Sequence, residues 1–119
     1  MKRIILLVLL LAAFPVRAMV VIATGKDLYE KLVDFKRSSS RDVATASTGV
    51  GFVLGVAQAL DEVRHPRTGF KFCLPPRGVS QGQLSDAVLH YLEKNPKLRH
   101  LSAYTLVQAA LDQAFPCKR

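Results

Sequence analysis

Residues 80–96, SQGQLSDAVLHYLEKNP, carry the clearest helical pattern in the chain. Ser80 stands three residues before Gln83, the spacing of a capping box, in which each side chain bonds the other residue's backbone N–H. The apolar residues that follow recur three and four positions apart, as on one face of an α-helix: Leu84, Ala87, Val88, Tyr91 and Leu92. Because proline does not continue a helix, Asn95-Pro96 ends the pattern. The stretch predicts an amphipathic helix with one face in a core.

Three further segments show helical signals. Thr24 and Asp27 have the spacing of another capping box, and an apolar stripe follows them: Leu28, Leu32, Val33 and Phe35. Small and aliphatic residues dominate positions 44–63, which predicts a second, largely buried helix. Ser102 is placed as the N-cap of a last helix, whose apolar face comprises Ala103, Leu106, Val107, Ala110, Leu111 and Ala114. We expect an all-α bundle of about four helices, with a proline-rich crossover at Pro75-Pro76 between the second and third.

Two glycines interrupt the second predicted helix. Gly51 and Gly55 are four residues apart and therefore share one helical face. Each glycine destabilises a helix interior by roughly 0.5–1 kcal/mol relative to alanine. We expect close approach of another helix to compensate for this cost.

The N-terminus predicts a secretory signal peptide. Lys2 and Arg3 precede an apolar run over residues 4–14, which is shorter than the ~20 residues that cross a bilayer core. Small residues then precede cleavage after Ala18, the first choice, or after Ala23. We expect residues 1–18 to be removed and residues 19–119 to form one exported domain.

The alternative is an uncleaved anchor over residues 4–23. It would place Pro15 and Arg17 within the membrane span, and an arginine near mid-membrane costs roughly 2.5–3.5 kcal/mol on insertion scales. The cost favours cleavage, after which we expect no membrane attachment.

The chain is basic, but its charge does not predict a nucleic-acid partner. Of the 17 basic residues, Lys2, Arg3 and Arg17 leave with the signal peptide, so 14 remain against nine acidic ones and the formal charge falls from +8 to +5. The remaining basic residues are scattered, and no aromatic side chains interleave them as a stacking platform. We expect acidic partners such as an anionic protein surface.

Cys73 and Cys117 are the two cysteines of the chain. Export to an oxidising compartment and an even count favour a disulfide between them. Two free thiols, or bridges between molecules, are the alternatives.

Catalytic and metal-binding patterns are missing from the sequence. His65, His90 and His100 are far apart in sequence, whereas a metal needs several ligands aimed at one point. Asp61 and Glu62 are adjacent, so they point in different directions from a helix. We therefore expect neither a cofactor nor an enzyme, although a free Cys73 beside a histidine would reopen nucleophilic chemistry.

Five stretches occur in order between residues 51 and 117: GFVLGVA, FCLP, GVSQGQL, YLEKNP and AALDQAFPC. Together they resemble the Tai/Rap family of type VI secretion amidase immunity proteins, over roughly residues 45–117. The resemblance implies a small, α-helical, periplasmic and usually dimeric protein. Such proteins bind a papain-like Cys/His peptidoglycan amidase injected by neighbouring cells and occlude its catalytic cleft. The alternative function is an accessory or structural envelope protein that docks without inhibiting.

Exposed, polar turns are the candidate binding sites, because recognition groups favour loops held by rigid helices. Two turns qualify, and their residues are Asn95, Lys97, Arg99 and His100 in one, and Arg64, His65 and Arg67 in the other. A homodimer would use an apolar helix face, either Gly51 with Gly55 or Leu84 with Val88. Both faces are equally consistent with packing inside one chain.

Overall fold

The computed structural model describes residues 21–37, 43–62 and 72–117 and confirms an all-α fold. Its elements, in order, are α2 (Gly25–Arg37), α3 (Val43–Glu62), α4 (Gln81–Lys94), the 3-10 turn η1 (Pro96–Leu98) and α5 (Ala103–Ala114). The described ranges contain two isolated β-bridges outside these helices, Thr24 with Ser102 and Phe72 with Pro116.

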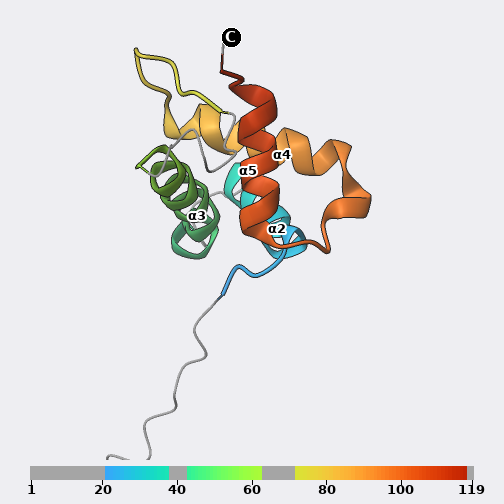
Figure 1. Cartoon of the computed structure of the whole chain (residues 1–119). Coiled ribbons are helices and arrows are strands. Elements are labelled where there is room, and N and C mark those ends of the chain that lie inside the picture. Colours follow the sequence, from blue (N-terminus) through green and yellow to red (C-terminus); the bar gives the residue numbers. More distant parts are fainter. Residues whose placement is uncertain (1–20, 38–42, 63–71, 118–119) are drawn as a thin grey trace, which may run out of the picture.

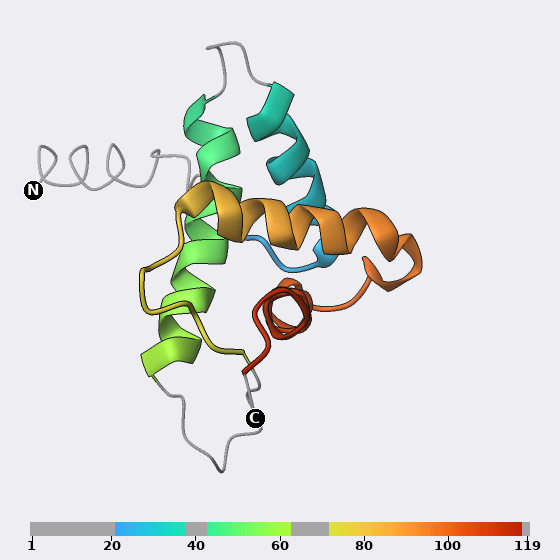
Figure 2. The same cartoon turned by 90° about the horizontal axis from the view of Figure 1, so that it is seen from above.

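The helices pack around a single core. In Figure 2, α2 and α3 run side by side in opposite directions, α4 lies across both, and α5 is viewed end on. Every helix contributes side chains that are less than 2% exposed, and the crossover adds one: Leu28, Val53, Leu60, Phe72, Val88, Leu92, Leu106, Val107 and Leu111. Burial of these side chains is the main stabilising contribution, at roughly 1.5–3 kcal/mol for each large one.

The predicted helix starts are confirmed by their hydrogen bonds. Gln83 N donates to Ser80 Oγ at 3.1 Å, and Ser80 N donates to Gln83 Oε1 at 2.9 Å. At the start of α2, Thr24 N donates to Asp27 Oδ2 at 2.9 Å, and Asp27 N donates to Thr24 Oγ1 at 3.3 Å. The hydrogen bonds from Thr24 lower the pKa of the Asp27 carboxyl below its ordinary value.

The prediction that Gly51 and Gly55 meet another helix is wrong for the helices that the structure describes. Both are exposed, and no described atom lies within 4 Å of where a Cβ would stand at either position. The buried residues of α3 lie on one face, so the helix is not buried all round: Ala46, Gly49, Val50, Val53, Ala57 and Leu60. The close approach to α2 occurs instead at Gly49, where a Cβ would stand 2.8 Å from Lys31 Cβ.

The predicted apolar stripes are confirmed in the main, with exceptions at their ends. Phe35 is 42% exposed although it continues the stripe of α2. Ala114, the last residue of α5, is also exposed, whereas Leu89 of α4 is buried outside the predicted stripe. Helix ends extend past the core, so periodicity alone does not fix the burial of their last residues.

The crossover before α4 is attached to the C-terminal end of α5. Cys73 and Cys117 form the predicted disulfide, with 4.8 Å between their Cα atoms, and Cys73 N donates to Phe115 O at 2.7 Å. The chain then turns toward α4 at Gly78, whose φ of 80° suits glycine.

The predicted signal peptide, residues 1–18, lies outside the described residues, as do the first candidate cleavage site, after Ala18, and most of the alternative anchor segment. Within the described ranges, no helix combines the length and apolar character of a membrane span.

We expect Cys73→Ser to lower the free energy of unfolding by about 2–5 kcal/mol, because the unfolded chain loses a cross-link between residues 44 apart in sequence. Urea denaturation under oxidising conditions measures the change. Reductant should lower the stability of the native protein to the level of the variant and leave the variant unaffected. An unchanged unfolding midpoint in Cys73→Ser would contradict a stabilising bridge.

Candidate functional site

The segment that joins α4 to α5 projects from the bundle. It comprises residues 95–102 and contains η1, and we call it the corner. Figures 1 and 2 both show it at the end of α4, on the side of the molecule away from α3. Several side chains of the corner are exposed, among them Lys97, His100 and Leu101.

Backbone hydrogen bonds hold the corner against the start of α2. Gly25 N donates to Leu101 O at 2.9 Å, and Lys26 N donates to Arg99 O at 2.8 Å. Gly25 is buried here, and a Cβ on it would overlap Leu106 Cδ1 and stand 3.1 Å from Arg99 Cα. The close approach therefore requires glycine, and the corner is a rigid element.

Arg99, for which partner binding stays a prediction, holds the corner to the bundle. Its Nε donates to Leu92 O at 2.8 Å, which satisfies a carbonyl in the last turn of α4. Its guanidinium carbon lies 3.7 Å from the centroid of the Tyr29 ring on α2, a cation–π contact. The side chain is half-buried by these contacts.

The other predicted residues of the corner divide into two kinds. Asn95 is the C-cap of α4, and its backbone N and its Nδ2 both donate to Tyr91 O, at 3.1 and 2.8 Å. Lys97 and His100 are exposed. His100 Nδ1 lies 2.8 Å from Lys97 O, which orients the imidazole while leaving one edge open. Of this predicted set, Lys97 and His100 are placed to meet a partner.

The second predicted turn, with Arg64, His65 and Arg67, lies outside the described residues. Its role in binding stays a prediction.

Two exposed apolar residues, one in the corner and one just after it, were not predicted. Leu101 is 37% exposed, and Tyr104, in the first turn of α5, is 43% exposed. Tyrosine is enriched in protein interfaces, where its ring and its hydroxyl both contribute. One feature of the sequence could have indicated that Tyr104 is exposed: it lies outside the apolar stripe that begins at Ala103. Lys97, His100, Leu101 and Tyr104 are the candidate surface.

The chemistry of this surface suits binding. It offers a cation, an imidazole, an apolar branch and an aromatic ring within eight residues of chain. In the described parts of the chain, no group of three or more histidine, cysteine, aspartate or glutamate side chains is arranged to hold a metal ion.

We expect Arg99→Ala to destabilise the protein by about 1–3 kcal/mol, because it removes a charge-assisted hydrogen bond and a cation–π contact. Thermal and urea unfolding measure the effect. Arg99→Lys should not restore stability, since an ammonium lacks the planar fork. Lys97→Ala, a basic residue at the exposed surface of the same corner, is the matched control and should stay within about 0.5 kcal/mol. Equal effects at both positions would refute the structural role of Arg99.

Of the comparisons with known proteins, the one with family models gave a match. No curated protein and no solved structure gave a match to the chain. A family model described as Rap1a immunity proteins matches residues 24–117. The match begins at the cap of α2, ends at the second cysteine of the disulfide and includes the corner. The chain therefore belongs to the Rap1a immunity protein family.

Proposed function

We propose that this protein is a periplasmic immunity protein that binds a type VI secreted peptidoglycan amidase and occludes its catalytic cleft. Family membership indicates the coarser function, immunity against a secreted effector. We propose the amidase target and the periplasmic site of action from the resemblance of residues 45–117 to amidase immunity proteins.

The projecting corner is the observation that carries the proposal. An inhibitor that enters a cleft loses affinity if its contact residues must be ordered on binding. Here Arg99, Asn95 and the hydrogen bonds to Gly25 and Lys26 order the corner beforehand. A rigid projection with an exposed aromatic ring fits a concave target.

The charge of the surface indicates which face of the amidase it meets. Lys97 is exposed and makes no ion pair with another described residue. An acidic rim around a Cys/His cleft would complement it and raise the association rate. Occlusion would then keep the peptide substrate from the catalytic cysteine.

Periplasmic action has two supports. The expected signal peptide at residues 1–18 would export the chain, and a disulfide joins Cys73 to Cys117. Structural disulfides persist in oxidising compartments and are rare in the cytosol of ordinary bacteria. Detection of the protein in the cytosol with both thiols reduced would contradict this part of the proposal.

We expect the protein to inhibit, at a one-to-one ratio, the amidase effector encoded beside its gene. Tyr104→Ala should weaken binding about 30-fold or more if the ring is a binding hot spot. An amidase assay on purified peptidoglycan and calorimetry measure inhibition and affinity.

Gln113→Ala is the matched control, because Gln113 is exposed on the same helix but lies near its far end. Both variants should keep the native melting temperature. Absence of inhibition at stoichiometric ratio would eliminate the amidase proposal. Binding without inhibition would favour the alternative, an accessory docking protein.

We also propose that the protein forms a homodimer through the outer face of α3. Leu84 is 5% exposed and Val88 is fully buried, so their stripe belongs to the core. Gly51 and Gly55 lie on the exposed face, where nothing in the described chain uses the missing Cβ. A second copy of α3 packing there would explain two glycines that otherwise weaken the helix.

We expect Gly55→Glu to convert the dimer to a monomer without loss of folding, because the position has room for a side chain and glutamate favours helix. Light scattering after size exclusion measures the mass. Gln113→Glu, an equal charge on another exposed face, should stay dimeric. A native protein that is monomeric at tens of micromolar would refute the dimer.

A further inference from the structure

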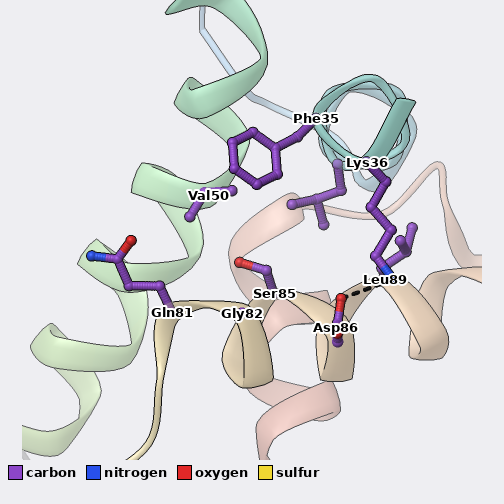
Figure 3. Close-up of a pocket in the computed structure, with 9 residues that line it drawn as sticks. Phe35, Lys36, Val50, Gln81, Gly82, Ser85, Asp86 and Leu89 are labelled. Atoms are coloured by element: carbon purple, nitrogen blue, oxygen red, sulfur yellow. Dashed lines mark ion pairs between the residues drawn. The ribbon is translucent and has the colours of Figure 1, made fainter. Parts of the chain in front are cut away.

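An apolar pocket lies between α2, α3 and α4, away from the corner. Its volume is about 160 Å³, and its wall includes Leu32 and Phe35 of α2, Val50 of α3 and Leu89 of α4. In Figure 3 the Phe35 ring extends from α2 toward Val50 and forms one side of the pocket. Phe35 is the residue that continues the apolar stripe of α2 yet remains 42% exposed.

A buried hydroxyl in the wall lacks a hydrogen-bond partner. Ser85 of α4 is 7% exposed, and among the described residues no donor or acceptor reaches its Oγ. Figure 3 shows the hydroxyl directed from α4 toward Phe35 and Val50, into the pocket. A serine within a helix can bond the carbonyl four residues earlier or point to solvent, and a buried hydroxyl without any partner is destabilising. Alanine at this position would avoid that cost, so the hydroxyl indicates an occupant.

The rim of the pocket indicates that the occupant is uncharged. Lys36 Nζ and Asp86 Oδ1 form an ion pair of 2.9 Å beside the opening, and each neutralises the other. Gln81 supplies a neutral amide at the rim. A charged group inside would lie among apolar side chains without a counter-charge.

The size of the pocket defines the occupant further. Apolar cavities of about 150 Å³ hold one benzene molecule, close to the volume found here. A single six-membered ring has the size that such a space holds, and one polar substituent on it would supply the partner that Ser85 Oγ lacks. An aliphatic group of equal size would fill the space but leave the hydroxyl without a partner.

We propose that this pocket binds a single aromatic ring that carries one hydroxyl, with that hydroxyl bonded to Ser85 Oγ. A free phenolic compound and the tyrosine side chain of a protein partner share this chemistry. The inference does not depend on the amidase proposal, because it rests on the pocket alone.

Phenol itself is the probe, and backbone amide NMR of the purified protein is the measurement. Saturable shifts are expected at Gly82, Ser85 and Leu89, with about millimolar affinity for so small a ligand. Ser85→Ala should weaken phenol binding about five- to tenfold through loss of one hydrogen bond. The same variant should leave the affinity for benzene unchanged, since benzene has no hydroxyl to bond. Ser85→Leu, which fills the space, should abolish binding of both.

Two results would overturn the proposal: no saturable shift with phenol in the native protein, or equal affinity of Ser85→Ala and native protein for phenol. A melting temperature of Ser85→Ala below that of the native protein would also overturn it, because the hydroxyl would then have a structural partner. Addition of the amidase effector to the phenol complex distinguishes the sources. Displacement identifies a tyrosine of the effector, and simultaneous binding identifies a free ligand; either result keeps the pocket assignment.

Discussion

The packing of α4 against the other three helices is the constraint on which the structure depends. Its buried residues face α2, α3 and α5 together, so α4 closes the core that these three helices share. The capping box of Ser80 and Gln83 fixes where α4 begins, and Asn95 fixes where it ends. Because both ends are defined, the apolar face has one register against its neighbours. The positions of the crossover and of the corner depend on that register, because the crossover leads into the start of α4 and the corner leaves from its end.

The helix that follows is held at both of its ends. At the start of α5, Ala103 N donates to Ala23 O at 3.0 Å, and beyond its end the disulfide holds Cys117 to Cys73. Twelve residues of helix separate the two attachments, about 18 Å. Tyr104 lies next to the first attachment and far from the second. Stability from the disulfide and local order at the corner therefore come from different interactions.

The sequence predicts most of the fold, because capping residues and apolar spacing act over three or four positions. Helix number and helix starts follow from such signals, whereas the disulfide follows from the two cysteines and the expected export. The role of Arg99 does not, because its acceptor is Leu92 O, seven residues earlier, brought close by a turn whose geometry the sequence does not display. The packing roles of Gly49 and Gly25 do not follow from the sequence either. They depend on which residue lies opposite each glycine in the fold, Lys31 for Gly49 and Leu106 for Gly25. Polarity identified the corner as a surface but did not separate its structural residues from its exposed ones.

The sequence also does not distinguish the surroundings of two exposed aromatic residues, which lie on different parts of the surface. Phe35 and Tyr104 are exposed to nearly the same extent, 42% and 43%, yet their surroundings differ. Tyr104 lies in the first turn of α5, a few residues after the exposed Lys97 and His100 of the projecting corner, whereas Phe35 forms the wall of a recess with a buried hydroxyl behind it. A projecting surface can enter the cleft of another protein, whereas a recess can only bind a group that another molecule inserts into it. One small bundle thus presents two surfaces of opposite shape, and different helices carry their aromatic residues, α2 for Phe35 and α5 for Tyr104.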